Sequence, residues 1–463
     1  MSALVGGVNE SIEVKNGQEK YDVKLGIREW KRYPEYKNSG VEWIGEIPKE
    51  WEVKPLKFAS ELNPEALPEN TDPDYILKYI DIGNVSLGTL VSEPTEMKFC
   101  NSPSRARKIV KNGDIIISTV RTYLKAILLI TNPDPNLIVS TGFAVIRSSL
   151  FNNPKYLYYA VRSTNFIEAV MAHSEGIGYP AINTSVLGKL PILITSSIEQ
   201  QAIVNFLDRE TSKINTLIEK KQRLIELLEE KRSALISHAV TKGLDPDVKM
   251  KDSEVEWIGE IPENWNAIKI KRLCQVKRGA SPRPIDNPIY FDDDGEYSWV
   301  RISDVTASNK YLRVTEQKLS LLGQSKSICL EPGSLFLSIA GSVGKPIITK
   351  IKCCIHDGFV YFEGSKQNSE YLFYLFSCSE MYKGLGKLGT QLNLNTDTIG
   401  DIRVPVPFPK EQEEIANFLD CETEKIDTFI NKISAQIEKL KEYRTALISA
   451  AVTGKIDVRE EVA

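Results

Sequence analysis

The pattern of apolar and polar positions divides this chain into two kinds of segment, and each kind occurs twice. Short β-type runs separated by turn residues dominate residues 51–194 and again residues 265–407. Two longer stretches, at 196–245 and 408–463, carry apolar residues at alternating steps of three and four. The first pattern is typical of half-buried strands, and the second indicates long helices. The chain is therefore predicted to be α+β, with two mixed α/β inserts and two long helices.

Strand-like runs follow one another in the same order in both inserts. The corresponding runs are 76–85 with 299–305, 114–120 with 332–339, and 141–147 with 358–362. A short helix with aromatic spacing follows in each insert, around Tyr156 in the first and Tyr371 in the second. Because the order is kept while the identity is low, the two inserts are predicted to share one fold and to present different surfaces.

The long segments carry a heptad seam, which predicts helix-on-helix packing. Seam positions are Ile214, Ile218, Ile225, Leu228 and Leu235 in the first copy and Ile426, Ile430, Ile433, Ile437, Leu440 and Leu447 in the second. Lys221, Arg232 and Arg444 interrupt the seam. Some 40 helical residues span roughly 60 Å. We expect the two helices to pack antiparallel as a coiled coil and to separate the inserts; the alternative is that each helix packs on its own insert.

Two blocks of sequence are kept almost unchanged between the halves. The motif V-E-W-I-G-E-I-P at 41–48 returns at 255–262, and E-Q followed by F-L-D at 199–208 returns at 411–420. Such an internal repeat predicts a pseudo-two-fold architecture. The expected boundaries are 1–38 for an N-terminal arm, 39–195 for the first domain, 196–245 for a central helical spacer, 246–407 for the second domain and 408–463 for a C-terminal helical spacer.

Composition sets loose bounds on this architecture. The chain of 463 residues is 42% hydrophobic and 26% charged, with a net charge of −4, as in ordinary soluble globular proteins. It has no apolar run of about 18 residues and no secretory leader pattern, so a cytoplasmic location is expected. Its seven cysteines contain no C-x-x-C pair. Reduced thiols are therefore expected, with adjacent Cys353 and Cys354 facing opposite sides of one strand.

Sequence motifs for catalysis are missing. The chain contains no nucleotide-hydrolysing loop, because Gly341–Lys345 lacks the required spacing and hydroxyl residue. His173, His238 and His356 lie far apart, and neither a nucleophile set nor a metal-spaced cluster is visible. We therefore predict no catalytic residues, no metal site and no enzymatic activity for the chain by itself.

Basic residues gather beside equivalent strand ends in the two inserts. Cations on loops held by a sheet suit phosphate contacts and the reading of base edges. The candidates for DNA contact are Arg105, Arg107, Lys108, Arg121 and Lys125 in the first insert and Arg278, Arg283, Arg301 and Lys345 in the second. The alternative for any one of them is a solvated surface charge.

Amide side chains form a second group of candidates, near the end of each insert. Amides can pair with adenine edges, although turn and cap roles remain open. The amide candidates are Asn183 in the first insert and Gln391, Asn393 and Asn395 in the second, and Tyr179, which begins the run that ends at Asn183, is a further candidate.

The paired motifs resemble those of the DNA-specificity subunit of type I restriction–modification systems. The resemblance covers nearly all residues after about 39 and is carried by both V-E-W-I-G-E-I-P motifs, G-D-I-I-I-S-T at 113–119, T-Q-L-N-L-N at 390–395 and the repeated E-Q…F-L-D motif. It departs at 178–183, where the first insert has G-Y-P-A-I-N, so only Asn183 and Asn395 correspond.

The resemblance implies two target-recognition domains separated by two antiparallel helical spacers. In that family each domain reads one half of a split, asymmetric DNA site, and the helices set the spacing and dock two methyltransferase subunits. Two endonuclease-translocase subunits join this complex. The chain would then be a non-catalytic subunit that binds no cofactor, while its partners use S-adenosylmethionine, ATP and Mg²⁺.

Two other functions stay open at this point. One is an interaction scaffold whose coiled coil and inserts bind proteins without any role in DNA binding. The other is a self-sufficient DNA enzyme, which the missing motifs oppose. Salt-dependent DNA binding would distinguish the DNA-specificity function from the scaffold, because phosphate contacts weaken steeply with salt.

Overall fold

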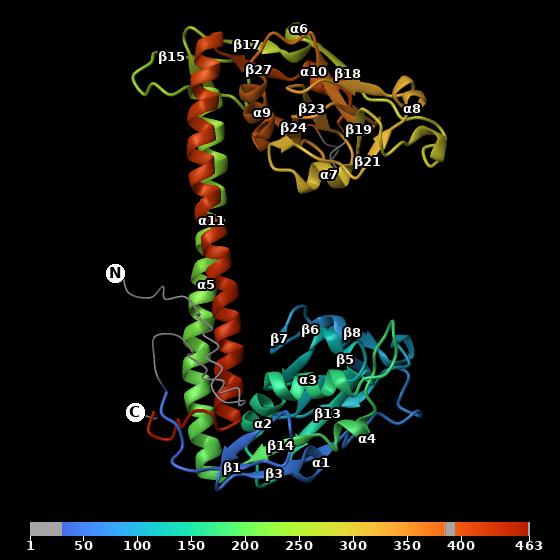
Figure 1. The fold of residues 1–463 in the computed structure, drawn as a ribbon, viewed down its shortest axis with the longest axis vertical. Helices are drawn as coiled ribbons and strands as arrows, with labels where there is room; N and C mark the ends of the chain where they lie inside the picture. Colours follow the sequence, from blue (N-terminus) through green and yellow to red (C-terminus); the bar gives the residue numbers. More distant parts are fainter. Residues whose placement is uncertain (1–29, 384, 386–393, 462–463) are drawn as a thin grey trace. The chain divides into compact units, whose positions relative to one another are not determined.

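The computed structural model describes residues 30–383, 385 and 394–461. The chain divides into two compact units, Met1–Lys221 with Ala435–Ala463, and Gln222–Ser434. The two long helices, α5 (Ser197–Lys242) and α11 (Pro409–Val452), both contribute to each unit (Figure 1). Of the predicted arm at 1–38, residues 1–29 lie outside the described residues.

The first unit contains two four-stranded sheets and three strand pairs. One sheet has the order β11-β10-β13-β4 and is antiparallel throughout. The other has the order β8-β5-β12-β9, with β5 and β12 parallel. The elements are β1 (Tyr36–Asn38), β2 (Glu46–Pro48), β3 (Glu52–Pro55), α1 (Leu56–Ala59), β4 (Ser60–Leu62), β5 (Ile76–Ile80), β6 (Val85–Ser86), β7 (Thr89–Leu90), β8 (Thr95–Lys98), β9 (Ala106–Ile109), β10 (Ile115–Ser118), β11 (Ile127–Leu129), β12 (Leu137–Ser140), β13 (Phe143–Ser148), α2 (Pro154–Val161), α3 (Thr164–Ala172), α4 (Thr184–Leu187) and β14 (Pro191–Ile194).

The second unit repeats most of this plan and adds a fifth strand, β20, to its first sheet. Its first sheet has the order β18-β26-β23-β24-β20, and its second has the order β21-β19-β25-β22, with β19 and β25 parallel. The elements are β15 (Met250–Asp252), β16 (Glu260–Pro262), β17 (Asn266–Lys269), α6 (Ile270–Leu273), β18 (Gln275–Arg278), β19 (Tyr297–Val300), α7 (Ile302–Ala307), β20 (Tyr311–Leu312), β21 (Gln317–Leu319), α8 (Leu321–Ser325), β22 (Ile328–Leu330), β23 (Leu335–Ser338), β24 (Pro346–Thr349), β25 (Cys353–Ile355), β26 (Phe359–Glu363), α9 (Ser369–Ser377), α10 (Thr396–Asp401) and β27 (Arg403–Val406). The prediction of one shared mixed fold is confirmed.

Two predicted strands end earlier than expected. The run 76–85 turns into the 3-10 helix η1 (Ile82–Asn84), and the run 299–305 turns into α7. Each turn begins with a capping interaction, in which the backbone N–H of Asp81 or of Arg301 donates to a side chain three residues on. Apolar periodicity does not reveal these caps, so the strand predictions were wrong at their ends.

Buried apolar side chains pack in layers within each unit. In the first unit, Ile115 and Ile117 of β10 face α2, α3 and the long helices, while Ile116 faces the second sheet. In the second unit, Leu335 and Leu337 face the helices and Phe336 faces the second sheet. This alternation follows from the two-residue period of a strand.

The repeated E-Q motif explains how each domain is attached to its long helix. Gln200 and Gln412 are buried. Gln200 accepts a hydrogen bond from the backbone N–H of Asn153, just before α2. Gln412 accepts one from the backbone N–H of Asn368, just before α9. Both distances are 2.9 Å. The amide group of Gln200 also donates to the carbonyl of Thr195 at 2.8 Å, just before α5. That of Gln412 donates to the carbonyl of Pro407 at 2.9 Å, just before α11. One side chain therefore connects the start of the short helix with the start of the long helix.

The repeated F-L-D motif supplies a second attachment. The hydroxyl of Tyr159 on α2 donates to Asp208 on α5 at 2.7 Å. The hydroxyl of Tyr374 on α9 donates to Asp420 on α11 at 2.5 Å. A lysine also reaches each aspartate, and these lysines come from different elements of the two domains, Lys155 in one and Lys310 in the other.

The two long helices run antiparallel in both units, as the heptads predicted (Figure 1). In the first unit, Lys221 donates to Gln436 at 2.6 Å and Arg444 donates to Asn215. In the second unit, Arg232 pairs with Asp427 at 3.3 Å. The three polar interruptions of the seam therefore each contact the facing helix, a use of polar seam residues that fixes register.

The buried glutamine gives the first test. Gln200→Leu should lower the free energy of unfolding of the first unit by about 2–4 kcal/mol, because it leaves the partly buried N–H of Asn153 and the buried C=O of Thr195 without partners. Hydrogen exchange measured by mass spectrometry should show faster exchange in α2 and unchanged exchange in α9. Gln222→Leu, at an exposed position of the same helix, is the control and should leave both helices protected. Equal loss of protection in the two variants would contradict the attachment role.

Candidate nucleic-acid interface

The carboxyl ends of the parallel strands form one polar edge in each unit. In the first unit β5 and β12 lead to Asp81 and Thr141, and in the second β19 and β25 lead to Arg301 and Asp357. The strand registers make Asp81 equivalent to Arg301 and Thr141 equivalent to Asp357. Loops that follow parallel strands meet at one edge, where ligands commonly bind. The same edge thus carries different charges in the two domains.

Arg105 lies at this edge in the first unit. Its guanidinium donates to Asp81 at 2.5 Å and to the hydroxyl of Tyr79 at 3.1 Å. Its backbone carbonyl accepts a hydrogen bond from Thr141, which places it beside the turn at 141–142. The neighbouring Arg107 stacks over Phe99 instead, with 4.7 Å from its guanidinium carbon to the ring centroid.

Arg121 and Lys125 flank the short turn η3 (Thr122–Leu124) at the same edge. Both are exposed and both have positive φ, at 51°. The Arg121 guanidinium carbon lies 4.8 Å from the ring centroid of Tyr179, which is itself 68% exposed. A bridge between Val120 and Ala181 holds the Tyr179 loop against the Arg121 turn. Four sequence-predicted candidates, Arg105, Arg121, Lys125 and Tyr179, are therefore brought to one edge.

Asp357 accepts hydrogen bonds from two of the predicted arginines of the second unit. Its carboxylate accepts from Ser281 at 2.8 Å and from Arg283 at 2.9 Å, and its backbone carbonyl accepts from Arg278. The hydrogen bond from Ser281, followed by the charge of Arg283, holds the pKa of the Asp357 carboxyl below its usual range. Arg278 and Arg283, far apart from Asp357 in sequence, are thereby brought together.

Arg301 and Lys345 occupy the same side of the second unit. Arg301 donates to Gln317 on β21 at 2.5 Å and lies 4.0 Å from the carboxylate of Glu316. The ammonium of Lys345 donates to the carbonyl of Thr306 at 3.0 Å, and burial lowers its pKa. Lys345 is therefore more enclosed than Arg301.

The asparagine candidates are helix caps. Asn183 accepts from the backbone of Ser185 at 2.9 Å at the start of α4, and Asn395 accepts from Thr398 at 2.8 Å at the start of α10. The cap role uses the side-chain oxygen of each asparagine. Both side chains are exposed, so the side-chain NH2 group stays accessible. Gln391 and Asn393 lie outside the described residues.

The side chain of Lys108 turns inward. It lies on β9, and its ammonium donates to the carbonyl of Phe143. Burial lowers the pKa of Lys108 to about 8. The strand registers make Ile328 its equivalent in the second domain, so a cation is not required at this place in the fold.

The heptad positions follow the face of each helix that is turned from solvent. None of the predicted seam residues is exposed. Those that are buried are Ile214, Ile225, Ile426, Ile433, Ile437 and Leu447, and those of intermediate exposure are Ile218, Leu228, Leu235, Ile430 and Leu440. Other apolar residues of the helices are exposed, such as Leu217, Leu224 and Phe429.

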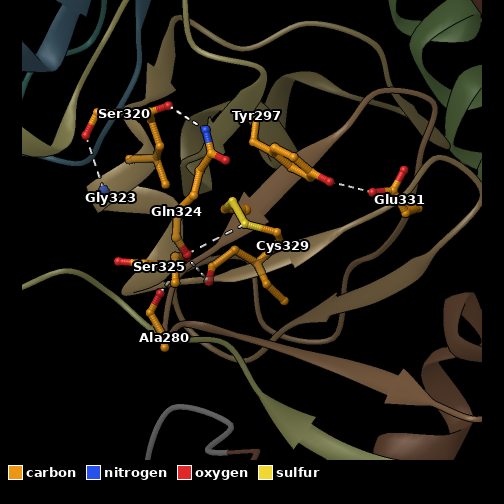
Figure 2. Close-up of a disulfide and its surroundings, with 12 residues drawn as sticks. Ala280, Tyr297, Ser320, Gly323, Gln324, Ser325, Cys329 and Glu331 are labelled. Atoms are coloured by element: carbon orange, nitrogen blue, oxygen red, sulfur yellow. Dashed lines mark hydrogen bonds between the residues drawn. A yellow bond between two sulfur atoms is a disulfide. The ribbon is translucent and has the colours of Figure 1, made fainter.

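The expectation that all cysteines are reduced is wrong for one pair. Cys329 on β22 lies directly opposite Cys354 on β25, with 4.0 Å between their Cα atoms, and the two form a disulfide (Figure 2). Strand register brings them together across 25 residues of sequence, which no spacing motif reveals. The prediction that Cys353 and Cys354 face opposite sides of one strand is confirmed, because they belong to different core clusters.

Sequence reasoning missed Asp81 and Asp357, the two carboxylates that hold arginines at the edges. The sequence alone indicates that the acidic residues are scattered over solvated helix faces, and it does not show that these two follow parallel strands. Alignment of the turn Thr141-Gly142-Phe143 with Asp357-Gly358-Phe359 was the available signal. Among the described residues, no group of three or more histidine, cysteine or acidic residues could hold a metal ion. No helix in the described part of the chain is long and apolar enough to cross a membrane.

Two α/β domains with polar, largely basic edges, carried by one antiparallel helix pair, are the architecture of a duplicated DNA reader. The profile of the type I restriction modification DNA specificity domain matches residues 48–227 and 262–439. These matches cover more than half of the chain, and the chain belongs to this family. It is a DNA sequence-specificity subunit of a restriction–modification system.

Individual relatives agree over most of the length. The chain is similar to the putative type I restriction enzyme MjaX specificity subunit of Methanocaldococcus jannaschii, with 23% identity over 439 residues, 90% of this chain and 96% of that protein. It is 25% identical over 342 residues to the MjaVIII specificity subunit of the same organism, 70% of this chain and 75% of that protein. A solved chain from a study of the assembly and conformational transition of the type I R-M system has a TM-score of 0.69 at 21% identity, covering 88% of this chain and 98% of that chain. This likeness confirms the fold.

The inward position of Lys108 gives the second test. Below about pH 8 the amine is charged in both states, and its burial destabilises the folded protein. Between about 8 and its ordinary value of 10.5, the folded protein loses the proton first, so the free energy of unfolding rises with pH. Lys108→Ile should remove this rise and stabilise the neutral-pH protein by on the order of 1 kcal/mol, since solvent screens a partly exposed amine.

Urea unfolding of both proteins across pH 7–10.5 measures this difference. The same substitution should leave the salt dependence of DNA binding unchanged, whereas Lys125→Ala should reduce the slope. A loss of DNA affinity in Lys108→Ile equal to that in Lys125→Ala would show that Lys108 contacts DNA.

Proposed function

We propose that the two domains read the two halves of a split, asymmetric DNA site, each through the polar edge at the ends of its parallel strands. The observation that carries this proposal is that one fold occurs twice with equivalent edges of different chemistry. Identical edges would favour a palindromic site, because a two-fold protein matches a two-fold operator. Edges that differ, as Asp81 differs from Arg301, favour two unlike half-sites.

The proposed domain boundaries are those expected from the repeat. Recognition domains comprise 39–195 and 246–407, the helical spacers comprise 196–245 and 408–463, and an arm comprises 1–38. In this proposal the two helical spacers set the interval between the half-sites, which a flexible linker would not do. Exposed apolar residues on the helices, including Leu217, Leu224 and Phe429, are consistent with docking of partner helices.

The proposed complex contains two methyltransferase subunits and two endonuclease-translocase subunits. This chain supplies recognition and no catalytic group, and the partners use S-adenosylmethionine, ATP and Mg²⁺. The relatives named above carry the word specificity in their names, which supports a division of labour between recognition and chemistry.

The central test is the set of methylated sites in a host that expresses this chain with its methyltransferase subunits. A split, asymmetric motif with modified adenine on each strand is expected, and it should be absent when this chain is omitted. The complex should bind that duplex with a steep salt dependence. A well-folded complex that yields no new methylated motif and binds DNA without salt dependence would favour the scaffold.

The length of the helix pair gives a further prediction. Seven residues inserted between Lys221 and Gln222, and seven between Ser434 and Ala435, keep the heptad register in both helices. The insertion adds about 10 Å, so the unread interval should lengthen by up to about three base pairs while both half-sites stay the same. The methylated motif reports the interval directly.

An insertion in one helix alone is the matched control. It offsets the two seams and should abolish specific methylation. If the doubly extended protein recognises the original interval, the helices do not set the spacing.

A further inference from the structure

The edge of each domain contains an arginine whose guanidinium is held by an aspartate. In the first domain Arg105 is held by Asp81 at 2.5 Å, and in the second Arg283 is held by Asp357 at 2.9 Å. The two pairs are not copies of one another. Arg105 precedes β9, whereas Arg283 follows β18, so each domain brings its arginine to the edge from a different strand.

Pairing with a carboxylate changes what an arginine can do at a DNA surface. The pair is close to neutral, so it contributes little to attraction for phosphates, which depends on net positive charge. The same carboxylate fixes the orientation of a planar fork that still has unused N–H donors. A guanidinium that is oriented and paired with a carboxylate is therefore suited to hydrogen bonding with a base edge rather than to contacting the phosphates of the DNA.

The hydrogen bonds of the first pair support this division. Arg105 uses its Nε for the hydroxyl of Tyr79 and one terminal nitrogen for Asp81, and 56% of its side chain remains exposed. Asp81 is occupied on both oxygens, because the other one accepts from the backbone of Ile82 at 2.8 Å. Both oxygens of Asp81 therefore already accept a hydrogen bond, one from the backbone and one from Arg105, and the second of these fixes the position of the guanidinium.

The carboxylate of the second pair holds its arginine in the same way. One oxygen of Asp357 accepts from Ser281 and the other from Arg283, so both are occupied. The side chain of Arg283 is 73% exposed. By contrast, Arg121 and Lys125 form no ion pair within the described residues, which leaves their full charge for phosphates.

We propose that Arg105, positioned by Asp81, and Arg283, positioned by Asp357, each read one guanine in the major groove, one in each half-site. Arginine donates two parallel hydrogen bonds to the O6 and N7 atoms of guanine, which lysine cannot reproduce with the same geometry. This inference rests on the proposed reading of two half-sites. It adds the base that each domain reads, and it assigns positioning roles to two carboxylates.

The test uses the full chain in complex with its methyltransferase subunits and the duplex that carries the motif methylated by the wild-type complex. A set of duplexes with one base pair replaced at a time gives the discrimination at each position. Arg105→Lys should lower discrimination at a single G·C pair of one half-site roughly ten- to hundred-fold and leave the other half-site unaffected. Arg283→Lys should do the same in the other half-site only. The salt slope should stay unchanged in both variants.

Two asparagine variants test the positioning role without removing the arginines. Asp81→Asn keeps an oxygen that caps η1 and frees the guanidinium from its counter-charge. It should weaken discrimination at the same base pair as Arg105→Lys, while it increases non-specific binding and steepens the salt slope. Asp357→Asn should behave in the same way for the pair read by Arg283. A purely structural role for these carboxylates would lower specific and non-specific binding together.

Asp134→Asn is the matched control. Asp134 pairs with Lys78 of β5 at 2.6 Å and precedes β12, so this change also frees a cation, but at the opposite end of the sheet. It should leave discrimination unchanged at every position. Lys125→Ala should reduce the salt slope by about one and weaken all duplexes equally.

The outcomes separate the inference from the function on which it depends. If the wild-type complex has no motif and no salt-dependent DNA binding, the proposed function fails. If the motif exists but the lysine variants keep wild-type discrimination at every base pair, the guanine assignment is wrong. Loss in both half-sites from one variant, or loss at an A·T pair, would also overturn it.

Discussion

Attachment of each domain to its long helix depends on one buried glutamine side chain. Gln200 and Gln412 each connect the N–H before an aromatic helix to the carbonyl before a long helix. Removal of such a side chain would leave buried backbone groups without partners, which costs more than an ordinary hydrogen bond contributes. The tyrosine–aspartate contacts of the F-L-D motif then fix the same pair of helices about two turns further along. The kept parts of the internal repeat are thus the parts that attach a domain to the helix pair.

This arrangement leaves the far edges of the domains free to vary. At equivalent positions the first domain has Asp81 and Thr141, and the second has Arg301 and Asp357. Each exchange changes charge or polarity without changing the strand order. The edges can therefore differ in what they bind while the packing beneath them stays the same. The proposed function needs this separation, because it gives the two halves the same partners and different half-sites.

The polar interruptions of the heptad seam have a comparable role. Lys221, Arg232 and Arg444 replace apolar residues, and each contacts a polar group on the facing helix within its unit. Such contacts add little stability when they are partly exposed. They do favour one register over its neighbours, because a shift by one heptad would separate every pair. Fixed register is the property that a spacing element requires.

The sequence by itself determined the duplication, the long helices, the succession of strand-like runs along each insert and the family, because these depend on local periodicity and on motifs that are contiguous in the chain. It also identified most arginines of the edges as candidates. Only the tertiary structure decided which of them act together. Asp81 meets Arg105, Asp357 meets Arg283 and Cys329 meets Cys354 because the packing of strands and loops joins residues that are 24, 74 and 25 positions apart. The inward turn of Lys108 was equally invisible, since a lysine on a strand has the same sequence signature whether its amine faces solvent or a buried carbonyl.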